Sequence, residues 1–335
     1  MSVTVIALSS RNPAARTVDS HGGLSHARFV TGASGWIGSA VVHELIGAGH
    51  QVVGLARSDA SAAALASAGA EVVRGTLDDL DTQRSAAAAS DSVIHLAFKH
   101  DIALSGDFQG ATDADRRAVE AIGEALASSG RPFVIASGTP AEPGRVATEG
   151  DGHSLAPAAA AGGDGQQARA ATSEWVLSLA SHGVRSSVVR LPRTVHGEGD
   201  HGFIAALVRI ARDKGVSGYF GDGTNRWPAV HRLDSAHLFR LALEKAPAGS
   251  TLHAVADEGV PLRGVAEVIG RHLNLPVVSI SPADADEHFT WLAGILGADQ
   301  PASSTLTREL MGWEPTQPGL IDDLDKGHYF RSPSA

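Results

Sequence analysis

The chain has 335 residues, 43% of them hydrophobic and 19% charged, which is enough to bury a large core in one large domain or two unequal ones. Its net charge of −10, from 37 acidic and 27 basic residues, argues against nucleic acid as the main partner. Because cysteine is absent, disulfides, thiolate catalysis and cysteine metal sites are excluded.

The first 25 residues are predicted to be a mobile extension ahead of the folded chain. Residues 3–8 are mostly apolar, but no basic segment precedes them, which argues against a secretory signal. Residues 9–25 are polar and rich in turn-forming side chains. No apolar run approaches the roughly 18 residues that would cross a bilayer. We therefore expect a cytoplasmic protein without a membrane partner.

A strand, a glycine-rich turn and a helix follow in direct succession. Residues 29–31 are predicted to be a short strand, which leads into glycines with the spacing G-x-x-G-x-x-G. A helix is predicted over residues 39–48. The unpaired N–H groups at the start of such a helix form an anion site, and glycine lets a pyrophosphate approach the backbone. This context predicts a dinucleotide site. The residues expected to contact the cofactor here are Gly32, Ser34, Gly35, Trp36, Ile37 and Gly38.

Strands and helices alternate along the next part of the chain. The predicted strands are mostly apolar and lie at residues 51–56, 71–74, 92–97, 133–137 and 187–191. The predicted helices lie between them at residues 59–68, 113–128 and 168–181. Apolar strands separated by helices are typical of a parallel sheet that is covered on both faces. The predicted fold class is therefore α/β, with residues 26–191 forming a Rossmann-type, doubly wound domain.

The alternation becomes less regular after residue 191. A helix is predicted over residues 203–214, a strand around Tyr219, and Asp234 is expected to cap a further helix. We expect residues 192–330 to form mainly a smaller substrate-binding lobe, either separate from the first domain or interleaved with it. This lobe would cover the carboxyl ends of the strands, where open α/β sheets bind ligands.

The order of the motifs resembles the extended short-chain dehydrogenase/reductase superfamily, which includes NAD-dependent epimerases and dehydratases. The resemblance covers about residues 28–330, and its motifs are residues 31–38, 93–97, 137–138, 190–197, 230–234 and 312–315. It implies a nicotinamide cofactor and a small-molecule substrate. Relatives often pair through the helices after the fourth and fifth strands, so a homodimer through residues 113–128 and 168–181 is also implied.

The catalytic pair of the superfamily is missing. The superfamily uses Tyr-x-x-x-Lys on the helix after the fifth strand, with the tyrosine as acid and the lysine lowering its pKa. The chain has two tyrosines, Tyr219 and Tyr329, and neither has a lysine four residues on. Aligning Glu174 with the acidic residue that often follows the motif places Gln166 and Ala170 at the two positions. The chain therefore resembles the atypical branch, which has lost the standard active site.

The residues after the second strand favour NADP(H) over NAD(H). A carboxylate there would bind the ribose 2′-hydroxyl of NAD, whereas a cation accommodates the 2′-phosphate of NADP. The chain has Arg57 and Ser58 at this point and no acid before Asp59. Arg57 offers a donor fork suited to phosphate, and Ser58 adds a hydroxyl. Further residues expected to line the cofactor are Leu77, Leu96, Ala97 and Pro192.

Three side chains are candidates for the chemistry. Ser137 corresponds to the superfamily's substrate-orienting hydroxyl, or it is a strand-end serine that caps a turn. Lys99, one of four lysines, is a candidate to replace the missing cation, although a surface charge is the alternative. His196 is a candidate proton donor, because histidine as a residue type exchanges protons near neutral pH, and a wall of the site is its alternative role.

The candidates for substrate binding combine one aromatic wall with a few polar anchors. They are His100, Arg193, Asn225, Arg226 and Trp227. The alternative is that Trp227 is core and Arg226 is solvated. No metal is expected, because the histidines are scattered and lack a ligand spacing such as His-Glu-x-x-His.

These observations predict an NADP(H)-dependent oxidoreductase with a non-standard active site. It would transfer a hydride to or from a small organic C=O, C=N or C=C group. One alternative is an NADP-sensing regulator of the NmrA type that does not turn over. The other is a sugar-nucleotide epimerase or dehydratase, which the loss of the tyrosine disfavours.

Overall fold

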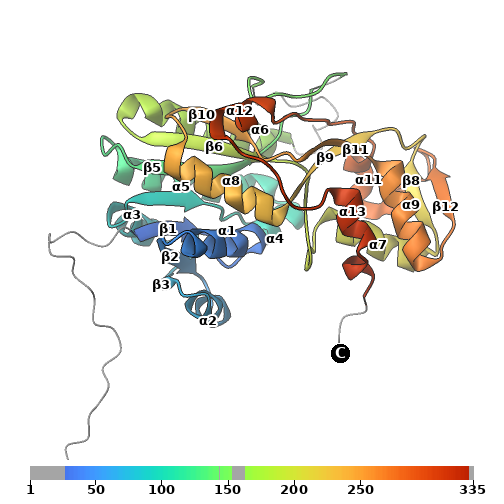
Figure 1. Cartoon of the computed structure of the whole chain (residues 1–335), viewed down its shortest axis with the longest axis horizontal. Coiled ribbons are helices and arrows are strands. Elements are labelled where there is room, and N and C mark those ends of the chain that lie inside the picture. Colours follow the sequence, from blue (N-terminus) through green and yellow to red (C-terminus); the bar gives the residue numbers. More distant parts are fainter. Residues whose placement is uncertain (1–26, 143, 153–162, 332–335) are drawn as a thin grey trace, which may run out of the picture.

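The structure, a computed structural model, describes residues 27–142, 144–152 and 163–331, so the predicted extension at residues 1–25 lies outside the described part. It has a large lobe built on a parallel sheet and a smaller lobe beside it (Figure 1). Within the described residues, no helix is both long enough and apolar enough to span a membrane.

The large lobe contains a seven-stranded parallel sheet in the order β10-β6-β5-β4-β1-β2-β3. Its strands are β1 (Ala27–Thr31), β2 (Gln51–Ala56), β3 (Glu71–Arg74), β4 (Ser92–His95), β5 (Pro132–Gly138), β6 (Arg185–Leu191) and β10 (Ser250–His253). The direction of winding reverses between β1 and β4, which is where doubly wound sheets bind ligands. The predicted α/β, Rossmann-type fold is confirmed.

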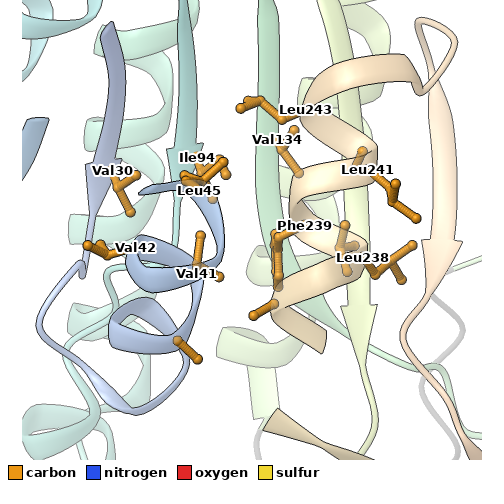
Figure 2. Close-up of a cluster of buried hydrophobic side chains, with 14 of the residues drawn as sticks. Val30, Val41, Val42, Leu45, Ile94, Val134, Leu238, Phe239, Leu241 and Leu243 are labelled. Carbon is orange, nitrogen blue, oxygen red and sulfur yellow. The ribbon is translucent and has the colours of Figure 1, made fainter. Parts of the chain in front are cut away.

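Helices cover both faces of this sheet. Helices α1 (Trp36–Gly47) and α8 (Arg232–Lys245) pack on one face, where Val41, Leu45 and Phe239 meet Val30 and Val134 (Figure 2). Helices α5 (Phe108–Leu126) and α6 (Gly163–Ser178) pack on the other face. Successive residues of a strand point to opposite faces, so both cores draw on the same strands. The remaining helices of this lobe are α2 (Asp59–Ser67), α3 (Leu80–Ala88), α4 (His100–Leu104) and the 3₁₀ turn η2 (Leu179–His182).

The boundaries of α5 differ from the prediction over residues 113–128. The helix starts five residues earlier, because the Asp107 carboxylate accepts a hydrogen bond from the N–H of Gly110 (2.8 Å) and caps it. It also ends earlier, at Leu126, and Ser128 has a positive φ of 57° that a helix cannot continue through.

The smaller lobe is formed mostly by the second half of the chain. Its strands are β7 (Thr194–His196), β9 (Arg226–His231) and β11 (Asp257–Pro261) in one sheet, and β8 (Ser217–Phe220) with β12 (Val277–Ile280) in another. Its helical segments are α7 (Phe203–Lys214), α9 (Leu262–Leu273), α10 (Ala285–Phe289), η3 (Thr290–Leu292), α11 (Ala293–Leu296), α13 (Leu320–Asp325) and η4 (His328–Phe330). The lobes are interleaved, because α8 and β10 return to the large sheet and α12 (Thr305–Met311) contacts both of these elements.

The expectation that Asp234 caps α8 is wrong. The cap is His231, whose Nδ1 accepts a hydrogen bond from the N–H of Leu233 (3.3 Å). Asp234 lies in the first turn and is buried, and its carboxylate accepts hydrogen bonds from the N–H groups of Thr316 (3.0 Å) and Gln317 (3.1 Å). It therefore fastens the C-terminal segment to the large lobe.

Candidate functional site

The glycine turn between β1 and α1 has a geometry that only glycine permits at two positions. Gly32 has a φ of +64°, and a Cβ on it would lie 2.7 Å from the backbone of Leu96 and Ala97. A Cβ on Gly38 would overlap the carbonyl oxygen of Gly32. The N–H of Gly35 donates to that same oxygen (2.9 Å), which closes the turn. The turn is thereby pressed against the end of β4.

The start of α1 fits a bound pyrophosphate. The backbone N–H groups of Trp36, Ile37 and Gly38 have no acceptor among the described residues. Ser34 and Gly35 are exposed next to them, so a ligand has access. Three free donors at the positive end of a twelve-residue helix form an anion site.

The side chain of Trp36 points toward the smaller lobe. Its indole N–H donates to the carbonyl of Val195 in β7 (3.2 Å), and the guanidinium of Arg232 lies over its ring at 4.4 Å. His201 meets the same ring edge-on at 5.9 Å. Trp36 therefore couples the glycine turn to the other lobe.

Two arginines lie together at the ends of β2 and β3. Arg57 is 73% exposed, and its nearest carboxylate is that of Asp101 at 3.7 Å. Arg74, which the sequence reasoning missed, pairs with Ala56 in the strand register and donates to the carbonyl of Ser58 (2.6 Å). Because Arg74 ends the strand predicted next after residues 51–56, its place in the sequence could have indicated that it lies near Arg57. Arg74 also forms an ion pair with Asp59 (2.7 Å), so each of the two guanidiniums has a carboxylate beside it.

The hydroxyl of Ser58 has a structural partner. It accepts a hydrogen bond from the N–H of Ser61 (3.2 Å), while the hydroxyl of Ser61 accepts one from the N–H of Ser58 (3.0 Å). This reciprocal pair caps α2. Binding of a 2′-phosphate by Ser58 stays a prediction, and the backbone near it is already ordered by the cap.

The residues predicted to make apolar contacts with the cofactor lie in three different surroundings. Leu77 is buried in a small cluster with Ala114 and Ala118, against which Ala97 packs. Leu96 and Ala97 touch the turn itself, through the close approach to Gly32. Pro192 is buried at the end of β6.

Lys99 forms an ion pair with a carboxylate in the segment that follows β3. Its ammonium forms an ion pair with Asp78 (2.6 and 2.8 Å), and Arg117 lies 3.9 Å from the same carboxylate. His100 begins α4, where its exposed ring contacts Phe98 at 5.0 Å. Lys99 thus already has a counter-ion, so replacement of the missing catalytic cation stays a prediction that this pairing disfavours.

Ser137 is buried at the carboxyl end of β5 and contacts α6. The hydroxyl of Ser173 lies 3.0 Å from that of Ser137. On the same helix, the Arg169 guanidinium lies 4.2 Å from the centre of the Phe98 ring. The helix also includes residues 166 and 170, the positions of the missing pair. Arg169 and Ser173 were missed, although each lies three residues after one of these two positions, a spacing that places side chains on one helical face.

His196 is fully buried in β7, away from solvent. Its Nδ1 lies 2.9 Å from a carboxylate oxygen of Asp323 in α13, and His328 lies 3.3 Å from the other oxygen. Burial alone would raise the pKa of Asp323, but hydrogen bonds and charge from the two histidines lower it to about 2. This geometry favours a structural role for His196, and a catalytic one stays a prediction.

Asn225, Arg226 and Trp227 hold a later segment of the chain against β9. The amide of Asn225 donates to the carbonyl of Leu296 (2.7 Å), and the fully buried Trp227 indole donates to that of Ala298 (3.1 Å). Arg226 forms a two-point ion pair with Asp299 (2.8 and 3.1 Å). Substrate binding by these three residues stays a prediction, while Arg193 has a different environment, described below.

Metal ligation has no support in the described part of the chain, where no group of three or more His, Asp or Glu side chains is arranged to hold an ion.

The parallel sheet, its switch point and the glycine turn with free N–H groups define an α/β protein that binds a nucleotide. The chain belongs to the NAD-dependent epimerase/dehydratase family, whose model matches residues 28–255. The resemblance read from the sequence is confirmed.

Individual relatives and structures agree with this assignment. An uncharacterized protein of Schizosaccharomyces pombe is 47% identical over 304 residues, 90% of this chain and 99% of that protein. A 4-hydroxy-2-methyl-3-oxo-4-farnesyl-3,4-dihydroquinoline-1-oxide ketoreductase of Stigmatella aurantiaca is 27% identical over 88% of each chain. The crystal structure of the dTDP-glucose 4,6-dehydratase DesIV of Streptomyces venezuelae, with NAD bound, shares the fold with a TM-score of 0.71, 19% identity and coverage of 91% and 96%.

Proposed function

We propose that the chain is an NADP(H)-dependent oxidoreductase that reduces or oxidises a small organic C=O, C=N or C=C group. The observation that carries this proposal is the end of β2, where exposed Arg57 stands at the point at which a carboxylate would bind the ribose of NAD. Arg74 adds a second guanidinium on the adjacent strand end, where it is paired with Asp59. When bound, the cofactor supplies or accepts the hydride.

Ser137 orients the acceptor in this proposal. Its hydroxyl sits at the carboxyl end of β5, 3.0 Å from the Ser173 hydroxyl, which also lies 3.3 Å from the carbonyl of Arg169. When Ser173 donates its one proton to Ser137, the Ser137 proton is available for an oxygen or nitrogen of the acceptor. A hydroxyl aimed at the atom where negative charge develops stabilises the transition state. Ser173 is a positioning residue that acts through Ser137.

We assign the proton transfer to water. His196 is fully buried with its Nδ1 engaged by Asp323, and the Lys99 ammonium is engaged by Asp78. Tyr329 is no better placed, because its hydroxyl donates to Asp200 (2.8 Å) and burial raises its pKa. Tyrosine-dependent epimerisation needs a tyrosine whose pKa is brought toward the working pH, so this arrangement disfavours it. The likeness to a ketoreductase supports a carbonyl substrate.

Calorimetric titration with NADPH and NADH tests the cofactor assignment. We expect NADPH to bind at least about tenfold more tightly, a difference of about 1.4 kcal/mol. Arg57→Ala should remove that preference, because the 2′-phosphate loses its paired donors. Asp101→Asn is the matched control, since it removes the only described carboxylate paired with Arg57 and should strengthen NADPH binding by about twofold.

Equal affinity for the two nucleotides, or a preference unchanged in Arg57→Ala, would contradict the NADP assignment. If the unmodified chain bound neither NADPH nor NADH, both the oxidoreductase and the NADP-sensing regulator would be excluded. Tight NADPH binding without turnover across a panel of carbonyl, imine and enone compounds would favour the NmrA-type regulator.

A further inference from the structure

Arg193, directly after β6 and Pro192, holds an unusual position for a charged side chain. Its Nε donates to the neutral amide oxygen of Gln300 (2.8 Å). Its guanidinium lies 5.2 Å from the ring centre of Trp227 and 5.9 Å from that of Phe203. In the part of the chain that the structure describes, no carboxylate forms an ion pair with it. The cation is therefore enclosed by aromatic rings and an amide.

Burial lowers the pKa of Arg193 to about 10, so the side chain remains a cation at neutral pH. No neighbouring charge offsets this desolvation. Arg193 is half-buried, and a partly desolvated charge without a counter-ion is costly, so binding an anion there would recover part of the loss. Arg193 therefore fits a site completed by a ligand.

Other arginines in the same region have their charge compensated. Arg226 on the neighbouring strand is paired with Asp299. Arg190 is also buried, but the carboxylates of Asp151, Glu149 and Glu174 raise its pKa against the effect of burial. Arg193 thus differs from Arg226 and Arg190, because no carboxylate offsets its desolvation.

An exposed aromatic surface adjoins the guanidinium. The ring of Trp291 lies 5.9 Å from that of Phe203, yet Trp291 remains 51% exposed. The preceding residue, Thr290, has a φ of +53°, which is strained for a β-branched side chain. Backbone strain of this kind is concentrated at functional sites. The rings of Phe203 and Trp291, tilted by 38° to one another, form with Arg193 an apolar surface that has one positive end.

This surface lies at the edge of the sheet where Ser137 is found. In the register of β5 and β6, Ser137 pairs with Arg190 and Gly138 with Leu191, two residues before Arg193. The N–H of Thr139 donates to the carbonyl of Leu191 (2.9 Å), which keeps the two strand ends together. The backbone that carries Arg193 therefore leaves the sheet at the strand end where Ser137 lies.

We propose that Arg193 binds the carboxylate of a substrate whose flat, apolar part lies against Phe203 and Trp291. This inference rests on the proposed oxidoreductase function and names its substrate class, a monoanionic, aromatic or similarly flat acid. The single charge follows from the neighbouring strand, because Arg226 is neutralised by Asp299 and adds no net charge. A guanidinium fork binds a carboxylate through two parallel hydrogen bonds.

The test is calorimetric titration of the full chain with 2-naphthoate and with 2-naphthamide, which differ in charge and share their ring system. We expect naphthoate to bind at least about tenfold more tightly, and Arg193→Gln to abolish the difference. Arg209→Gln, which removes an exposed charge from α7, is the matched control and should keep it. NADPH affinity, measured on the same variants, shows that the nucleotide half of the Arg193→Gln protein is folded.

Equal binding of the acid and the amide, or no binding of either, would overturn the proposal. A loss in Arg209→Gln equal to that in Arg193→Gln would do the same, because it would indicate general electrostatic attraction. Tighter, Arg193-dependent binding of 2-naphthyl phosphate than of naphthoate would overturn the monoanionic assignment. A different result, failure of the unmodified chain to bind NADPH, would overturn the proposed cofactor function.

Discussion

Gly38→Ala is expected to weaken NADPH binding by about a hundredfold, or about 2.7 kcal/mol. The added methyl group would overlap the carbonyl oxygen of Gly32 and lie 2.8 Å from its carbonyl carbon. Both are backbone atoms, so no side chain can rotate away and the turn must open. Opening the turn displaces the three free N–H groups at the start of α1. Calorimetric titration with NADPH measures the loss.

Gly47→Ala is the matched control, at the other end of the same helix. A Cβ on Gly47 would meet no atom within 4 Å. We expect NADPH affinity to be unchanged and the free energy of unfolding to rise by about 0.5 kcal/mol, because alanine loses less backbone entropy in a helix. A Gly38→Ala protein that binds NADPH as tightly as the Gly47→Ala control would show that the turn tolerates the methyl group and does not hold the cofactor.

Asp323→Ala is expected to lower the free energy of unfolding by about 3 kcal/mol. The substitution leaves the buried ring of His196 without its partner and removes the acceptor near His328. Urea unfolding at neutral pH measures the change. Asp322→Ala is the matched control on the same helix, because Asp322 is exposed, and we expect less than about 0.5 kcal/mol there. Equal losses in the two variants would show that the buried pair adds no stability.

The effect of Asp323 should also depend on pH. Its pKa is lowered from the ordinary value of 3.8 to about 2 in the folded protein. A carboxylate with a lowered pKa contributes its full stabilisation above the unfolded value and loses it as the pH falls through the folded value. The stability difference between the unmodified chain and Asp323→Ala should therefore shrink between about pH 4 and 2, where the carboxylate is protonated. A difference that stayed the same or grew between pH 4 and 2 would contradict this assignment.

The fold was predictable from sequence because its signals are local. The turn from Gly32 to Gly38 lies within a few residues of the strand and helix that it joins, and the apolar strands have a spacing that allows few topologies. The capping box of Ser58 and Ser61 is equally local. Contacts of this range follow from backbone geometry, which the order of residues determines.

The environment of the candidate site was much less predictable, because its contacts join distant parts of the chain. Arg193 meets Gln300 across 107 residues, and His196 meets Asp323 across 127. A charged residue in a loop has no sequence signal that tells whether a counter-ion will lie beside it. The sequence therefore indicated which residues were candidates, while the fold determined that Lys99 has a counter-ion and that Arg193 has none among the described carboxylates.

The return of β10 to the large sheet limits how the molecule can be divided. A fragment ending at Leu191 would contain the entire glycine turn but lack the strand that pairs with β6 from Ser187 to Arg190. It would also lose α8, so the apolar side chains that Leu238 and Phe239 cover would be open to water. An uncovered parallel strand edge next to bare apolar surface is a template for association between copies. The nucleotide-binding half is thus an incomplete folding unit, which gene fusions or truncations placed at residue 191 would turn into an aggregating species.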